Sequence, residues 1–190
     1  WNVIGPDFWV NNEQQAYIDA PETIRFIDIS ETAGADGGAL ALQPVYRKGF
    51  ETPDGRKVDF VSGRIDTRDR FEFTYGCAAA RVKMPDAVGV WPAFWLLGNG
   101  KWPETGEIDI MEWFGAQFTG RPNQVQSAVH TTHNHWGSAA GLLFDKRDVA
   151  NMCSEFHRFQ LHWTANEILI GVDDVPTFSY KKPSNASTDK

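Results

Sequence analysis

The chain has 190 residues, enough for one domain with a full hydrophobic core. Its formal net charge of −7 argues against nucleic acid and anionic membrane surfaces as partners, because both attract clustered Lys and Arg side chains. No apolar run approaches the roughly 20 residues of a membrane-spanning helix, so no membrane partner is predicted.

Helical periodicity is almost absent, and short strand-like runs alternate with turn signals. The candidate strands, in chain order, are 13–19, 23–29, 39–46, 57–66, 70–84, 90–97, 106–114, 124–131, 140–144, 156–163, 167–173 and 176–180. A single helical turn is predicted over Lys146–Ser154. We therefore predict an all-β fold: a jelly-roll β-sandwich of two antiparallel sheets, with a concave cleft that suits a polymer.

The chain is rich in aromatic residues, with eight Trp, thirteen Phe and four Tyr. This composition fits an all-β domain that binds flat apolar ligands such as sugar rings. The two cysteines, Cys77 and Cys153, are too few for a disulfide framework and fit no zinc motif. Buried free thiols are favoured, and a single bridge stays open as the alternative.

The most informative stretch is the hexapeptide Glu-Ile-Asp-Ile-Met-Glu at residues 107–112. Strict strand alternation places Glu107 and Asp109 on one face and points Glu112 into the core. Burying a lone carboxylate there would cost several kcal/mol or force it to stay neutral. A one-residue bulge near Met111 resolves the conflict by turning Glu112 onto the face of the other two acids.

Three carboxyl groups on one wall would separate in pKa, so that one stays protonated near neutral pH. Cleavage of a glycosidic bond requires one protonated and one ionised carboxyl group. Acids in strands are often just the solvated face of a sheet. The aromatic flanks Trp102, Trp113 and Phe114 favour a binding site over that reading.

Indole rings are the best platforms for the apolar faces of sugars, so Trp91, Trp95 and Trp102 are candidate substrate-binding residues. Ordinary core packing is the alternative for each of them. Asn12 and Arg64 are polar residues in apolar surroundings and are candidates for binding sugar hydroxyls. A structural hydrogen bond is the alternative for these two.

The run 130–136 contains three histidines and ends at Trp136. His130 shares a strand face with Gln126, opposite Val125 and Val129, and is predicted to line the cleft. His133 and His135 fall in the loop that follows, so convergence on a metal ion is not implied. A substrate-binding loop carrying Trp136 is the preferred interpretation, and no metal ligand is predicted.

Residues 106–112 resemble the active-site strand of glycoside hydrolase family 16, in the bulged Glu-x-Asp-x-x-Glu form found in laminarinases, agarases and carrageenases. Further segments resemble family positions in family order: 11–13, 62–65, 75–76, 80–85, 89–95, His130, 156–157 and 172–173. The resemblance therefore covers nearly the whole chain. It is strongest to bacterial laminarinase-type endo-1,3-β-glucanases.

By this resemblance, Glu107 is the nucleophile, Glu112 is the general acid and base, and Asp109 helps to set which carboxyl group holds the proton. The resemblance implies a retaining endo-glycosidase that hydrolyses internal β-1,3-glucosidic bonds of laminarin-like β-glucan. It also implies a secreted or extracellular monomer that requires no cofactor.

Residues 1–190 are predicted to form one catalytic domain. Family domains usually begin with a strand upstream of Trp1 and end with one beyond Lys190. The resemblance thus implies a domain without its terminal strands. In many relatives these strands hold a structural calcium ion, so calcium binding stays open.

Three alternatives compete with this function. A non-catalytic β-glucan-binding, lectin-like module has the same fold but typically lacks the paired glutamates. A hydrolase of mixed-linkage glucan, agarose or carrageenan would use a similar strand. Sulfated polymers call for basic side chains in the cleft, where only Arg64 is an obvious candidate, so neutral glucan is preferred. A cupin-like metal protein that uses the histidines is the third.

Overall fold

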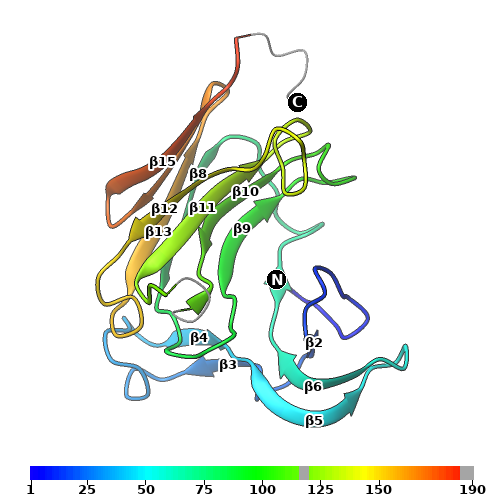
Figure 1. The fold of residues 1–190 in the computed structure, drawn as a ribbon. Coiled ribbons are helices and arrows are strands. Elements are labelled where there is room, and N and C mark those ends of the chain that lie inside the picture. The colour runs from blue at the N-terminus through cyan, green and yellow to red at the C-terminus, as the bar shows by residue number, and fades with distance from the viewer. Residues whose placement is uncertain (116–119, 185–190) are drawn as a thin grey trace. The chain divides into compact units, whose positions relative to one another are not determined.

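The computed structural model describes residues 1–115 and 120–184 (Figure 1). The chain forms two compact units, residues 1–73 and 74–190. Strands dominate both units, which confirms the all-β prediction. Within the described ranges, no helix is both long enough and apolar enough to cross a membrane.

The first unit contains seven strands in three small sheets. Strands β2, β6 and β5 form one sheet, in which β2 and β6 run parallel; β3 pairs with β4, and β1 with β7. Their bounds are β1 Asn2–Val3, β2 Gln15–Tyr17, β3 Ile24–Ile27, β4 Ala39–Leu42, β5 Val45–Glu51, β6 Lys57–Ser62 and β7 Ile65–Asp66. Ala16 of β2 and Val61 of β6 are fully buried and anchor this unit's core.

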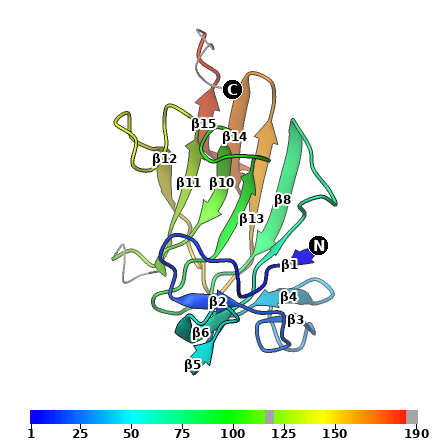
Figure 2. The same ribbon diagram turned by 90° about the vertical axis from the view of Figure 1, so that its right-hand side faces the viewer.

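The second unit is a sandwich of two four-stranded antiparallel sheets (Figure 2). One sheet has the order β12-β11-β10-β9, and the other β15-β14-β13-β8. Their bounds are β8 Gly76–Val82, β9 Ala93–Leu97, β10 Glu107–Glu112, β11 Gln124–His130, β12 Leu143–Asp148, β13 His157–Trp163, β14 Glu167–Val172 and β15 Val175–Lys181.

Apolar side chains from both sheets fill the space between them. Val125 and Val129 of β11 are buried, as the alternating pattern predicted, and they meet residues such as Phe159 and Ile170 of the opposite sheet. Alternate positions of β13 and β14 are buried in the same way. The sandwich therefore has one apolar interior and leaves the outer face of β9–β12 for polar side chains.

Several details of the sequence prediction are wrong. Lys146–Ser154 is not a helical turn: its first residues lie in β12, which pairs with β11, and only a backbone turn at Asn151 follows. The predicted strands 39–46 and 57–66 are each split in two. Both cysteines are free, but neither is buried: Cys77 is exposed and Cys153 is partly exposed.

The second split follows from a close approach of two backbones. A Cβ at Gly63 would lie 2.5 Å from the carbonyl oxygen of Thr23, so only glycine fits there. The first split has a simpler cause. Pro44 has no N–H to donate to a sheet, and it separates β4 from β5.

Candidate active site

The bulge predicted in β10 is present. Asp109 pairs with Ala128 of β11 and Glu112 pairs with Gln126, so three steps along β10 correspond to two along its neighbour. The register with β9 shifts at the same place. The extra residue returns Glu112 to the face that carries Glu107 and Asp109.

Burial within β10 follows the bulge. Ile108, Ile110 and Met111 belong to the core between the sheets, although Ile110 and Met111 are adjacent in sequence. The acids occupy the opposite face, where Asp109 and Glu112 are only 4% and 8% exposed. Carboxyl groups this deeply covered need hydrogen-bond partners, and the neighbouring elements supply them.

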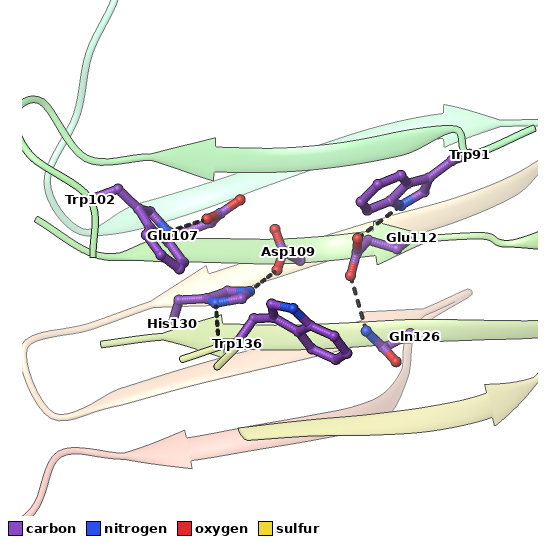
Figure 3. Close-up of polar contacts among 8 residues, drawn as sticks. All are labelled: Trp91, Trp102, Glu107, Asp109, Glu112, Gln126, His130 and Trp136. Atoms are coloured by element: carbon purple, nitrogen blue, oxygen red, sulfur yellow. Dashed lines mark hydrogen bonds and ion pairs between the residues drawn. The ribbon is translucent and has the colours of Figure 1, made fainter. Parts of the chain in front are cut away.

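Both oxygens of Glu112 accept hydrogen bonds (Figure 3). The indole Nε1 of Trp91 donates to Oε1 at 2.9 Å, and the side-chain amide of Gln126 donates to Oε2 at 3.1 Å. Trp91 itself packs against the ring of Phe114, with 5.3 Å between the ring centroids. Glu112 is thus held from both sides, by the segment before β9 and by β11.

Glu107 is held by the loop between β9 and β10. The indole Nε1 of Trp102 donates to Oε2 of Glu107 at 2.6 Å. The same indole lies against two histidine rings, with centroid distances of 5.6 Å to His130 and 5.3 Å to His135. The Trp102 side chain is therefore fixed in place while 39% of its surface stays accessible to a ligand.

A directed chain of hydrogen bonds reaches Asp109. The backbone N–H of Trp136 donates to Nδ1 of His130 at 3.4 Å, so the neutral imidazole carries its proton on Nε2. That nitrogen lies 3.1 Å from Oδ2 of Asp109 and donates to it. Asp109 in turn shares a hydrogen bond with Glu107.

Burial raises the proton affinity of all three acids. It raises the pKa of Glu107 to about 7, with Asp109 adding to the rise. It also raises the pKa of Asp109 to about 8, with a contribution from the charge of Glu112. The pKa of Glu112 is raised by burial too, against the hydrogen bonds from Trp91 and Gln126, which lower it.

The opposite effect acts on His130, whose pKa burial lowers. The charges of Glu107 and Glu112 oppose this effect and raise the pKa of His130, and a protonated His130 in turn lowers the pKa of both glutamates. Because the three carboxyl groups interact, their protons are lost in steps that belong to the cluster as a whole. Near neutral pH the cluster holds both ionised and protonated carboxyl groups, which glycosidic cleavage requires.

Five of the predicted substrate-binding residues belong to the second unit and surround the acids. Trp91, Trp102, His130 and Trp136 make the contacts described above. Trp95 pairs with Asp109 across β9 and β10 and shares its face. Asn12 and Arg64 lie in the first unit, where the Arg64 guanidinium stands 4.4 Å from the centroid of the Phe8 ring.

Sequence reasoning missed three contacts of this site. It placed Gln126 on the correct face but gave it no role, and it did not pair His135 with Trp102 or Phe114 with Trp91. The alternation of β11 contained the signal for Gln126, because it shares parity with His130. The two ring contacts depend on loops, whose course no periodicity encodes.

The histidines of the run 130–136 do not converge. His130 faces Asp109, whereas Nδ1 of His135 lies 3.2 Å from the carbonyl oxygen of Thr131. In the described part of the chain, no three His, Cys, Asp or Glu side chains are gathered in a way that could hold a metal ion.

Comparison with known proteins places this geometry in a family. The family model described as glycosyl hydrolases family 16 matches residues 35–189. The chain is similar to a beta-glucanase of Rhodothermus marinus, with 33% identity over 197 residues that cover 98% of this chain and 60% of that protein. The chain therefore spans about three fifths of the length of that relative.

Solved structures agree with this match. SCLam, described as a non-specific endo-beta-1,3(4)-glucanase from family GH16, superimposes with a TM-score of 0.81 at 26% identity, covering 97% of this chain and 65% of SCLam. A Bacteroides ovatus GH16 protein in complex with a G4G4G3G product gives a TM-score of 0.70 at 31% identity, covering 100% of this chain and 75% of that one. The chain belongs to glycoside hydrolase family 16.

Proposed function

We propose that this chain provides the catalytic site of a retaining endo-glycosidase that hydrolyses internal β-1,3-glucosidic bonds of laminarin-like β-glucan. The observation that carries the proposal is the cluster of Glu107, Asp109 and Glu112 on one sheet face, with raised pKa values and indoles on both sides. Such a cluster combines acid, base and nucleophile chemistry with platforms for sugar rings.

In the proposed first step, ionised Glu107 attacks the anomeric carbon and forms a covalent glycosyl ester. Glu112 donates its proton to the glycosidic oxygen, so the leaving sugar departs as a neutral alcohol. In the second step, Glu112 takes a proton from water, whose oxygen attacks the anomeric carbon and releases Glu107. Each carboxyl group is then back in its starting state.

Asp109 has a supporting part in this scheme. It shares a hydrogen bond with Glu107, and His130 holds its other side. When Asp109 keeps a proton, it can stabilise the ionised nucleophile; when it is ionised, it opposes the ionisation of Glu107. The reaction needs no cofactor, because side chains carry both the proton and the covalent intermediate.

The spacing along β10 supports retention of anomeric configuration. A bulge makes five residue steps count as about four, or roughly 13 Å along a strand. Side chains that lean several ångströms toward each other in the reacting complex would bring the carboxyl groups to about 5–6 Å. Retaining glycosidases need about 5–5.5 Å, whereas inverting ones need about 6.5–9.5 Å to admit a water molecule.

We propose that Trp95, Trp102 and Trp136 bind sugar rings. For Asn12 and Arg64, which lie in the first unit, binding of sugar hydroxyl groups stays a prediction from the sequence. A neutral glucan suits this site better than a sulfated polymer, because the contacts of the acid cluster come from indole, imidazole and amide groups. Glucans are also what the similar proteins act on by name: the beta-glucanase of Rhodothermus marinus, SCLam and the Bacteroides ovatus protein. A polymer of this size is degraded outside the cell, so we propose that the protein is secreted.

The test compares four polymers with one set of variants. Reducing-end release from laminarin, mixed-linkage glucan, agarose and carrageenan should be greatest with laminarin, and proton NMR should show the β-anomer as the first product. Glu107→Ala should abolish turnover. Glu112→Ala should lose about 10²–10⁴-fold on laminarin, yet form the covalent intermediate normally from activated aryl glycosides, which need no leaving-group proton.

Each competing function gives a different result. A lectin-like module would bind laminarin and release no reducing ends, with or without Glu107. A first product in the α-configuration would mean inversion, and a wild-type rate in either glutamate variant would contradict the roles proposed here.

A further inference from the structure

The two hydrogen bonds to Glu112 differ in a way that matters for a residue that must be both acid and base. The indole Nε1 of Trp91 can only donate, so Oε1 of Glu112 must accept in every protonation state. The proton that Glu112 carries as an acid therefore belongs on Oε2. That oxygen faces the side-chain amide of Gln126, at 3.1 Å from Nε2.

An amide group can serve either form of a carboxyl group. Its NH₂ donates to an ionised oxygen, and its C=O accepts from a hydroxyl group after a half-turn about the terminal bond. The half-turn exchanges donor and acceptor without moving the rest of the side chain. Gln126 is directly opposite Glu112 in the β10–β11 register, so the two side chains point to the same face and stay within reach during such a turn.

We propose that Gln126 is a positioning residue that reverses its side-chain amide as Glu112 gains and loses its proton. It donates Nε2–H to the carboxylate that acts as base, and it accepts the Oε2–H of the acid through its own Oε1. This inference rests on the proposed acid–base role of Glu112. It adds a partner that keeps Glu112 in one rotamer through both steps.

Other titratable groups also face Glu112. Glu107 and Asp109 lie on its own strand, and His130 lies on β11. Lys146 of β12 is directly opposite Gln126. None of them can replace Gln126: the two acids repel the carboxylate, His130 donates to Asp109, and Lys146 can only donate. The strand β9 presents Ala93 opposite Glu112 and supplies no polar group there.

Nuclear magnetic resonance can follow the reversal without any substitution at this site. In ¹⁵N-labelled protein, the Gln126 amide protons should shift upfield and exchange faster with water as Glu112 becomes protonated. In Glu112→Gln, Trp91 holds the new carbonyl oxygen, so the new NH₂ faces Gln126 and forces it to accept. The Gln126 resonances should then match the low-pH wild-type positions at every pH.

Kinetics supply a second readout. Gln126→Met keeps the side-chain length but removes donor and acceptor, so both half-reactions should slow by about tenfold to a hundredfold, the effect of losing one hydrogen bond to a charged group. The protonated and the ionised form of Glu112 each lose one hydrogen bond in this variant, so the pKa of Glu112 should not change. The alkaline limb of kcat/KM should therefore stay at the same pH. Gln124→Met, two residues away on the same face, is the matched control and should behave as wild type.

Three results would overturn the proposal: amide resonances that ignore the titration of Glu112, an alkaline limb that moves upward in Gln126→Met, or half-reactions that keep their rates. The second result would mean that Gln126 only donates. If the proposed function itself is wrong, either the wild type releases no reducing ends or Glu112→Gln keeps the wild-type rate, whereas the resonance titration reports the hydrogen bond independently of turnover.

Discussion

His130 and Asp109 connect the two central strands of the acid-bearing sheet through a contact of 3.1 Å between Nε2 and Oδ2, and both side chains are buried. The direction of this bond is set from outside, because the backbone of Trp136 donates to the other imidazole nitrogen. One oxygen of Asp109 is thus permanently occupied as an acceptor. A proton on Asp109 is therefore shared with Glu107, the partner of its other hydrogen bond.

Replacing Asp109 by asparagine should move the acidic limb of kcat/KM to lower pH. The carboxyl group of Asp109 raises the pKa of Glu107, second only to burial, and asparagine carries no charge. The pH profile on laminarin measures the effect. Asp145→Asn on the exposed strand β12 is the control and should leave the profile unchanged; an unmoved acidic limb in Asp109→Asn would contradict the coupling.

Replacing Trp102 by phenylalanine should move the same limb in the opposite direction. The indole N–H lowers the pKa of Glu107, and phenylalanine keeps a ring for stacking but cannot donate. Activity should therefore fall most on the acidic side of the optimum. Trp9→Phe is a chemically matched control, because Trp9 Nε1 also donates a hydrogen bond, to the carbonyl oxygen of Glu13 in the first unit. Equal losses at all pH values would refute the electrostatic account.

The free energy of unfolding should decrease as the pH rises through the acid cluster's titration. Glu107 and Asp109 have ordinary pKa values of 4.5 and 3.8, raised to about 7 and about 8 in the folded chain. Between about pH 4 and 8, the folded state binds more protons than the unfolded state, so stability falls with pH. Below this window both states are protonated, and above it the loss is complete.

Denaturant titrations across that pH range test the prediction by difference. The double variant Glu107→Gln, Asp109→Asn should show a flatter pH dependence than wild type, because neither replacement titrates. If the free energy of unfolding changed with pH in the same way in both proteins, the buried acids would not be responsible for the pH dependence of stability between about pH 4 and 8.

Replacing Trp136 by alanine should weaken substrate binding without lowering the melting temperature. Its indole is 77% exposed, and its contact with His130 uses the backbone N–H, which alanine retains. A lost stacking platform of about 1–2 kcal/mol corresponds to a five- to thirtyfold rise in KM. Trp1→Ala removes an equally exposed indole from the first unit and is the control. A large fall in melting temperature would instead indicate a packing role for Trp136.

The sequence predicted the centre of this site because two physical rules conflicted there. Alternation pointed Glu112 into the core, and a buried carboxylate is too costly, so a bulge was required. The register shift between Asp109 and Glu112 confirms it. The burial of Val125 and Val129 followed from the same alternation, because strand periodicity is local information.

Other features depend on contacts between distant segments. Strand β12 ends at Asp148, whereas the sequence predicted an end at residue 144. Residues 145–148 are in strand conformation because they pair with β11, and their own sequence does not encode that pairing. The bond from Trp102 to Glu107 depends on the course of the β9–β10 loop. The position of Gln126 in the sequence indicates only a polar residue on an open sheet face. Its role depends on its pairing with Glu112 across the sheet, which the sequence does not encode locally.

The bulge also has a consequence for how β10 tolerates change. In a regular strand, every position keeps its parity, so a substitution alters one side chain and nothing else. In β10 the parity changes partway along, which is why the neighbours Ile110 and Met111 both enter the core. Loss of the one extra residue together with the bulge would leave Glu112 two regular steps from Asp109, still on the acid face, and would remove only one of the two adjacent core side chains. The number of residues between the two glutamates is therefore tied to the bulge: a strand with the bulge needs the extra residue, and a regular strand needs its loss, if both glutamates are to share one face.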